Sequence, residues 1–152
     1  LVPMLLQERA RRFTFDGREC AGHIGPLSRF VLWSAMVDSL LAELALGKID
    51  GGEIQLLFAG GVHDAVSSAM VQVLVAPLAA RGVKVGVLMG SAYLFTQEIV
   101  ADGAIVAQFQ REVLDCDRTI NLESGPGHAS RCAYTPSITE LVEFGRPPST
   151  VM

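Results

Sequence analysis

A short polar stretch rich in glycine places a histidine where it could transfer protons. The stretch is Arg18-Glu19-Cys20-Ala21-Gly22-His23-Ile24-Gly25-Pro26, and it directly follows an extended run at residues 12–15. An imidazole titrates near neutral pH, so it can act as a general base or as a general acid. Loops at the carboxyl ends of parallel strands collect catalytic groups, because the sheet below holds them rigidly. We therefore take His23 as the candidate catalytic residue.

Two further strand-like runs end in small residues that suit a phosphate group. Ala59-Gly60-Gly61 ends one run, and Gly90-Ser91 follows the next. Glycine lets the backbone approach an anion closely, and unpaired N–H groups at a following helix start attract it. The Ser91 hydroxyl can donate one more hydrogen bond. Short glycine turns are common by themselves, yet two in consecutive units favour a shared phosphate site.

Other side chains allow alternative chemistries. Two thiols and two imidazoles could together bind zinc, although their spacing is loose: Cys20, His23, His128 and Cys132. Cys20 could also be a nucleophile with His23 as its base, but no third orienting group is evident. Glu19 is either a carboxylate that supports the site or a solvated side chain. We predict no metal ion at this site.

The elements that must position these residues are three strands in repeated strand–helix units. Extended runs occupy residues 12–15, 54–59 and 83–89, and each precedes a helical pattern. The second run is too apolar for a half-exposed antiparallel strand and suits a strand that is buried on both faces. Repeated units of this kind require right-handed crossovers and a parallel sheet covered by helices. We predict an α/β fold of parallel βα units.

Helical patterns follow each strand. Apolar residues recur at helical spacing from Phe30 to Leu44, and Gly47 follows as a stop. The face of this helix that carries Phe30, Trp33 and Val37 is expected in the core. Asp64, preceded by His63, can cap a helix over residues 65–81. Pro77 should kink the last turn of this helix. Further helical segments are expected over residues 93–101 and 105–116.

The two ends of the chain carry weaker signals. Residues 1–11 have an apolar side and a basic end, as the last turns of a helix would. A short extended piece at residues 119–122 and a turn at residues 125–127 precede a tail that we expect to be irregular. We accordingly predict a partial barrel domain over residues 1–135 and a tail over residues 136–152.

Composition narrows the classes of function. The 152 residues are 50% hydrophobic and 18% charged, as in an ordinary globular domain, and the net charge is −4. Because Lys and Arg are scattered singly, we expect no nucleic-acid partner. No apolar run is long enough for a membrane span, and the start lacks the pattern of a signal peptide, so we expect a cytoplasmic protein without a membrane partner. Three cysteines in such a chain suggest reduced thiols.

In combination, the three junctions resemble a known enzyme family. Glu19-Cys20-Ala21-Gly22-His23, Ala59-Gly60-Gly61-Val62 and Met89-Gly90-Ser91-Ala92-Tyr93-Leu94-Phe95 are similar to the C-terminal portion of the nitronate monooxygenase (2-nitropropane dioxygenase) family of FMN-dependent TIM barrels. The related flavin enoyl-acyl-carrier reductases share the pattern. The longer sequence pattern is similar to the branch embedded in polyketide synthases; it includes Gly125-Pro126-Gly127-His128-Ala129-Ser130-Arg131-Cys132.

This resemblance implies a cofactor and roles for the site residues. It implies FMN, with NADH or NADPH as a possible reductant, and His23 as the catalytic acid–base group. The positions that would hold the phosphate and ribityl region are Gly22, Ala59, Gly60, Gly61, Gly90 and Ser91. Two positions depart from the family: Ala21 replaces a glycine, and Ser91 replaces a threonine while keeping the hydroxyl. The Ala21 methyl could clash if its backbone required a positive φ.

The chain also departs from the family in length, and this leaves two functional hypotheses. A TIM barrel takes about 250 residues, so only the C-terminal part of a (β/α)8 barrel is expected here. The first hypothesis is an FMN-dependent oxidoreductase domain that oxidises alkyl nitronates or reduces enoyl thioesters, either small or bound to an acyl carrier. Such a domain would act with the missing half of the barrel or within a larger synthase. The second is a non-catalytic remnant or interaction module that retains a phosphate half-site. An incomplete barrel leaves sheet edges unpaired and should leave apolar residues of 54–59 and 83–89 against solvent or a partner. The expected outcomes are self-association, pairing with another polypeptide, or a loosely packed monomer.

Overall fold

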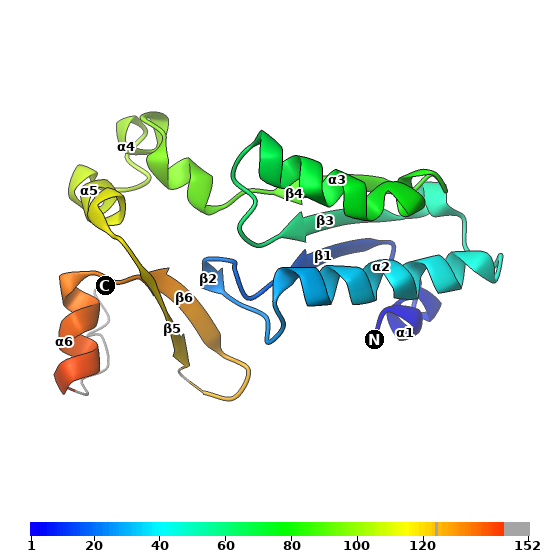
Figure 1. The fold of residues 1–152 in the computed structure, drawn as a ribbon, viewed down its shortest axis with the longest axis horizontal. Helices are drawn as coiled ribbons and strands as arrows, with labels where there is room; N and C mark the ends of the chain where they lie inside the picture. The colour runs from blue at the N-terminus through cyan, green and yellow to red at the C-terminus, as the bar shows by residue number, and fades with distance from the viewer. Residues whose placement is uncertain (124, 145–152) are drawn as a thin grey trace.

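The parallel sheet predicted from the sequence is present at the centre of the chain. The structure, a computed structural model, describes residues 1–123 and 125–144, and the side chains of residues 1–123 and 125–140. Three strands form the sheet in the order β1-β3-β4: β1 (Arg12–Asp16), β3 (Gln55–Ala59) and β4 (Lys84–Leu88). Both pairings are parallel, and the last residues of the three strands are in register. The junctions after β3 and β4 therefore lie side by side at one edge (Figure 1).

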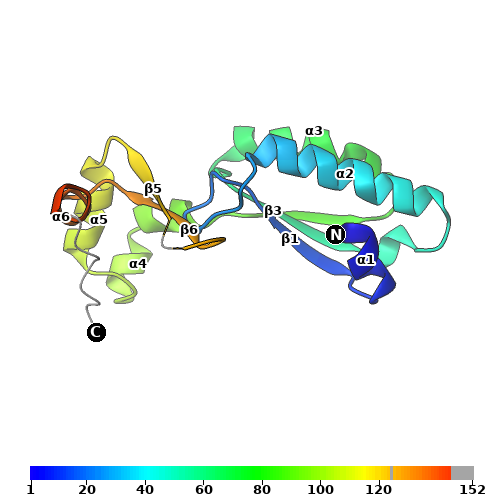
Figure 2. The same ribbon diagram turned by 90° about the horizontal axis from the view of Figure 1, so that it is seen from below.

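Helices α2 (Arg29–Ala45) and α3 (Ala65–Ala79) cover one face of this sheet, as Figure 2 shows. Trp33 of α2 is 1% exposed and packs edge-on against Phe58 of β3, with 5.6 Å between ring centroids. Burying this large aromatic pair stabilises the contact between α2 and the sheet. The predicted core positions of Trp33 and Val37 are confirmed, whereas that of Phe30 is wrong, because its side chain at the start of α2 is 42% exposed.

Local capping explains where the two long helices begin and end. The Asp64 side chain accepts a hydrogen bond from the Ser67 amide, and the Ser67 hydroxyl accepts one from the Asp64 amide, so α3 starts with a capping box. Helix α3 continues through Pro77 and ends at Ala79. Gly47 follows α2 with a φ of 68°, as the predicted stop requires.

The face of the sheet opposite these helices is open. Leu57 alternates with the buried Leu56 and Phe58 and is 40% exposed, and Leu88 at the end of β4 is 44% exposed. Strand β3 is thus buried on one face only, because no element among the described residues covers its second face. The expectation that an incomplete barrel leaves apolar residues of β3 and β4 exposed is confirmed.

Beyond the carboxyl ends of these strands lies a second, antiparallel sheet that the sequence did not predict. Its order is β2-β6-β5, formed by β2 (Gly22–His23), β6 (Ala129–Ala133) and β5 (Thr119–Glu123). The predicted extended piece and turn belong to its β5–β6 hairpin (Figure 1). Strand β6 carries no alternation of apolar and polar side chains, so its sequence gave no signal for a strand.

The remaining helices are short. Helix α1 (Val2–Gln7) ends before the basic residues that were expected to finish it, and Val2 and Leu6 join the core. The helix expected over residues 93–101 is divided into the 3-10 helix η2 (Ser91–Phe95) and α4 (Glu98–Ala101), whereas α5 (Ala107–Asp115) confirms the next prediction. A 3-10 helix η1 (Gly51–Glu53) leads into β3.

The irregular tail predicted from residue 136 is wrong over its first part. Residues 136–144 form helix α6 (Pro136–Phe144), in which proline occupies the first helical position, where its missing N–H is not needed. The rest of the predicted tail, residues 145–152, lies outside the described residues. The domain boundary at residue 135 stays a prediction. Over the described residues, no helix combines the length and the apolar character needed to cross a membrane.

Candidate functional site

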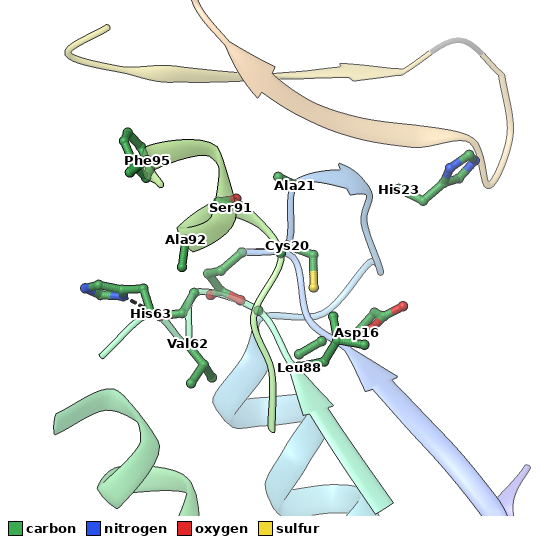
Figure 3. Close-up of a pocket in the computed structure, with 15 residues that line it drawn as sticks. Asp16, Cys20, Ala21, His23, Val62, His63, Leu88, Ser91, Ala92 and Phe95 are labelled. Atoms are coloured by element: carbon green, nitrogen blue, oxygen red, sulfur yellow. Dashed lines mark hydrogen bonds between the residues drawn. The ribbon is translucent and has the colours of Figure 1, made fainter. Parts of the chain in front are cut away.

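A cavity of about 490 Å³ lies at the carboxyl edge of the parallel sheet. Both glycine-containing junctions line it, together with the loop that follows β1 (Figure 3). The structure thus brings together most of the predicted cofactor-binding positions: Ala59, Gly60, Gly61, Gly90 and Ser91. Gly22 does not line this cavity but a neighbouring groove.

The junction after β3 has a backbone that only glycine accommodates. Gly60 has a φ of 127° and Gly61 a φ of 68°. A Cβ on Gly61 would lie 2.5 Å from Nη1 of Arg29, so any larger residue would displace that side chain. Among the described residues, neither the Gly61 nor the Val62 amide has a hydrogen-bond acceptor. Two consecutive amides without acceptors beside a cavity are suited to an anion.

The junction after β4 is less constrained. Gly90 has a negative φ, and a Cβ there would meet no atom within 4 Å. Ser91 begins the 3-10 helix η2, so the α-helix N-terminus expected at this position is absent. The contribution of this junction is therefore local: the small Gly90 keeps the cavity open, and the Ser91 hydroxyl stands at its wall (Figure 3).

His23 lies at the margin of the cavity. Its backbone pairs with Ser130 in the second sheet, and its exposed imidazole meets the ring of His128 edge-on, with 6.3 Å between centroids. Figure 3 shows the His23 ring directed toward the β5–β6 hairpin, on the opposite side of Ala21 from Ser91. The residue expected on a free loop thus belongs to the two-residue strand β2.

The departure at Ala21 causes no backbone strain. Ala21 is exposed, and it is not among the described non-glycine residues with a positive φ. The neighbouring Gly22 takes that conformation, with a φ of 77° and no atom within 4 Å of a built Cβ. Gly22 therefore forms the turn into β2, and its cofactor-binding role stays a prediction.

The alternative chemistries of the cysteines find little support. Burial, followed by the Asp16 carboxylate, raises the pKa of Cys20 to about 11, so its thiol is protonated at neutral pH and is a poor nucleophile. Burial, followed by Cys116, also raises the pKa of Cys132. Within the described ranges, no group of three or more His, Cys, Asp or Glu side chains is placed to hold a metal ion.

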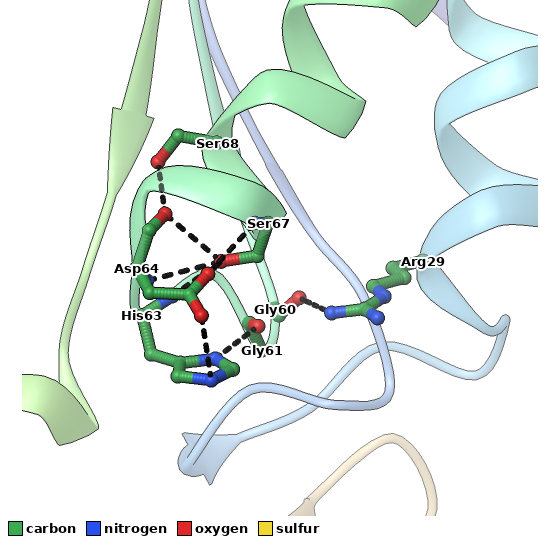
Figure 4. Close-up of polar contacts among 7 residues, drawn as sticks. All are labelled: Arg29, Gly60, Gly61, His63, Asp64, Ser67 and Ser68. Atoms are coloured by element: carbon green, nitrogen blue, oxygen red, sulfur yellow. Dashed lines mark hydrogen bonds and ion pairs between the residues drawn. The ribbon is translucent and has the colours of Figure 1, made fainter.

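Two side chains that the sequence did not assign to the site contact the first glycine junction. Nη1 of Arg29 donates to the Gly60 carbonyl at 3.0 Å, and Nδ1 of His63 lies 3.0 Å from the Gly61 carbonyl (Figure 4). His63 was interpreted only as part of a helix start, and Arg29 had no local signal. Only the fold brings Arg29 across to a junction 31 residues later.

A groove of about 1110 Å³ adjoins the cavity and shares Ala21, Gly61 and Ser91 with it. Its far walls come from η2, α5, the second sheet and α6. Apolar side chains on these walls include Leu94, Phe95, Phe109, Val113 and Ile138. The second sheet and α6, the elements that sequence reasoning failed to identify, thus build much of the groove.

Solved structures share this fold. FabK from Thermotoga maritima is 22% identical with a TM-score of 0.60, and a point mutant of it is 21% identical with a TM-score of 0.61. In both cases the match covers 93% of this chain but only 39% of the FabK chain. The sequence matches no known protein-family model and no curated protein. The prediction of an α/β fold, with parallel βα units forming part of a TIM barrel, is confirmed.

Proposed function

We propose that this chain supplies the phosphate-binding part of an FMN-dependent oxidoreductase. The observation that carries the proposal is the cavity into which the two junctions, residues 60–61 and 90–91, both open. The motif resemblance to flavin-dependent TIM barrels and the fold shared with FabK support it. The flavin would supply the electron or hydride chemistry, and the protein would bind and orient it.

The residues present fit a phosphate group. The Gly61 and Val62 amides offer two donors that no described group uses, and the Ser91 hydroxyl can add a third. Because Gly61 has no side chain and a left-handed backbone, the backbone itself forms this wall of the cavity, and a Cβ there would displace Arg29. Contacts of this kind recognise the phosphate of FMN rather than its ring.

His23 is proposed as the group that exchanges a proton with the substrate. Its exposed imidazole can take a proton from carbon next to a nitro group or donate one to an enoyl thioester. The ring stands where the cavity meets the second sheet, which holds its backbone through the pairing with Ser130. Productive alignment requires the reacting atom of the substrate to come within hydrogen-bond reach of this ring at the margin of the cavity.

The groove favours an enoyl thioester over a small alkyl nitronate. Its volume and its apolar walls from α5 and α6 suit an acyl chain, and a small nitronate would leave most of that surface uncovered. The resemblance to the branch embedded in polyketide synthases agrees with an acyl-carrier-bound substrate. Strand β6, which carries part of that motif, forms one wall of the groove through Arg131 and Cys132. NADH or NADPH would serve as the reductant.

The open sheet face favours a second candidate, a non-catalytic interaction module. This chain spans 39% of the length of the FabK chains, and Leu57 and Leu88 remain exposed. Under either candidate, the open face needs the remaining part of a barrel, a larger synthase or a second copy to cover it. The two candidates differ in whether flavin binds and reacts.

Comparing FMN with riboflavin tests the proposal. The purified 152-residue chain is titrated with each, and binding is followed by quenching of flavin fluorescence. We expect FMN to bind more tightly, because only FMN carries the phosphate that the glycine junctions would hold. Equal affinity for the two, or binding of neither, would favour the interaction module.

A further inference from the structure

Two side chains form hydrogen bonds with the carbonyls of the glycine junction after β3, at Gly60 and Gly61. Gly60 O accepts from Arg29 Nη1 at 3.0 Å. Gly61 O lies 3.0 Å from His63 Nδ1, and because a carbonyl can only accept, the tautomer with a proton on Nδ1 makes this bond. Figure 4 shows the two side chains reaching the junction from different elements, Arg29 from α2 and His63 from the loop before α3.

Fixing these carbonyls also fixes the amides that follow them. In a trans peptide the C=O and the next N–H point in opposite directions. The Gly61 amide is therefore directed away from Arg29, and the Val62 amide away from the ring of His63. Both residues line the cavity, and neither amide has an acceptor among the described residues. The orientation of the two free donors is thus set by the two side chains behind them.

Arg29 itself is held firmly. Its backbone amide, the first of α2, donates to Glu19 Oε2 at 2.7 Å. Its guanidinium lies over the Phe30 ring at 4.9 Å and within 6.0 Å of the Trp33 ring. Stacking of this kind restricts a long side chain to one geometry. The guanidinium group that donates to the Gly60 carbonyl is therefore preorganised.

The charges around the cavity give Arg29 a second effect. Asp16 and Glu19 line the cavity, and its lining includes no Lys or Arg. Two carboxylates would repel a phosphate unless a cation lies nearby. Within the described part of the chain, the Arg29 guanidinium forms no ion pair with a carboxylate, and it touches the junction directly. Its charge also polarises the peptide whose N–H belongs to Gly61.

We propose that Arg29 and His63 are positioning residues that set the Gly61 and Val62 amides as an anion-binding pair, with Arg29 offsetting the carboxylates of the cavity. This inference rests on the proposed function, because it assigns those amides to the phosphate of FMN. It accounts for the contacts that Arg29, from another element, and His63, directly after the junction in sequence, make with consecutive carbonyls.

Ligand discrimination tests this assignment. Arg29→Ala should lower the affinity for FMN by about tenfold or more and leave the affinity for riboflavin within about twofold, because only the phosphate contact is lost. His63→Ala should act in the same direction, whereas His63→Asn, which keeps an N–H donor near the position of Nδ1, should recover most of the loss. Arg18→Ala is the control: it removes the same charge from an exposed side chain that reaches only Pro26 O, at 3.4 Å.

A second measurement on the ligand-free protein separates this inference from the proposed function. The Gly61 and Val62 amides should lose order in 15N relaxation when Arg29 is replaced by Ala or His63 by Ala, and keep it in Arg18→Ala. Arg29→Gln keeps a donor without the charge, and serves if the alanine variant does not fold. Unchanged order, or an unchanged FMN-to-riboflavin ratio in the variants, would overturn the positioning roles. A wild-type chain without any preference for FMN would overturn the proposed function, and with it the phosphate assignment, even if the amides lose order.

Discussion

The indole Nε1 of Trp33 donates a hydrogen bond to the Phe15 carbonyl at 3.2 Å, which ties α2 to the strand that leads into the site. Since this bond is buried, its loss removes a hydrogen bond that water does not replace. Trp33→Phe should therefore lower the free energy of unfolding by about 2 kcal/mol, from the lost bond and the smaller ring. Denaturant unfolding measures the change. Val31→Ala, on the exposed side of the same helix, should stay within about 0.5 kcal/mol; equal effects would deny Trp33 its anchoring role.

Alanine at Gly61 should remove flavin binding through a steric effect. The new Cβ would lie 2.5 Å from Arg29 Nη1 and would occupy a left-handed backbone position. We expect the affinity for FMN to fall by about tenfold or more, because the methyl group would displace the Arg29 side chain and strain the backbone of the junction. Gly103→Ala is the matched control: Gly103 has a φ of 73° but no atom within 4 Å of a built Cβ, so it carries only the backbone strain. The prediction fails if the two variants bind FMN equally well.

The Asp64 cap should make stability depend on acid pH. Hydrogen bonds from the Ser67 side chain and then the Ser67 amide lower the pKa of Asp64 below its ordinary value of 3.8. A lowered pKa means that the cap is fully effective above 3.8 and is lost as the pH falls through the folded-state value. Asp64→Asn keeps an oxygen acceptor but does not titrate, so the stability difference between it and the wild type should change only below pH 3.8. Denaturant unfolding of both proteins from neutral to acid pH measures this difference. A difference in free energy of unfolding that stays the same at every pH would contradict the prediction.

His23→Ala should separate proton transfer from cofactor binding in an assembled, active enzyme. We expect turnover to fall on the order of 10² to 10⁴ while FMN stays bound, since the imidazole lies away from the glycine junctions. Ser130→Ala changes the residue that pairs with His23 in β6 and serves as the control for damage to the second sheet. Unchanged turnover in the His23 variant would assign the residue a structural role.

Local signals were sufficient for the parallel sheet and insufficient for the second one. The apolar run that ends at Ala59, and the capping pair of Asp64 and Ser67, have short-range physical causes that the sequence displays. Strand β6 pairs with β5 in a hairpin and also with β2, more than 100 residues earlier, and its own side chains carry no alternation. Non-local pairing of this kind leaves no periodic mark in either segment.

The candidate site also combines features that local sequence signals predict with features that only the fold determines. The small residues at 60–61 and 90–91 could be predicted to meet, because consecutive parallel strands end at one edge. The contact of Arg29 with Gly60 could not be predicted, because it depends on the angle at which α2 crosses the sheet. The position of His23 was also inaccessible, because the second sheet, and not the loop itself, sets where its ring points.

The open face of the parallel sheet should make the isolated chain associate. Leu57 is 40% exposed at the centre of this face, and both outer strands, β1 and β4, have an unpaired edge among the described residues. Exposed apolar surface beside free strand edges favours contact with another polypeptide. Light scattering of the purified chain should therefore give a mass above the 16.2 kDa of one copy.

Charge placed on that face should reverse the association. Leu57→Lys should shift the measured mass toward that of a single copy, because burying the ammonium group in an interface costs more than leaving it in water. Leu46→Lys, at a residue that is 62% exposed at the end of α2, adds the same charge away from the open face and should leave the mass unchanged. A wild-type chain that scatters as one copy, or equal behaviour of the two lysine variants, would show that the open face is not what drives association.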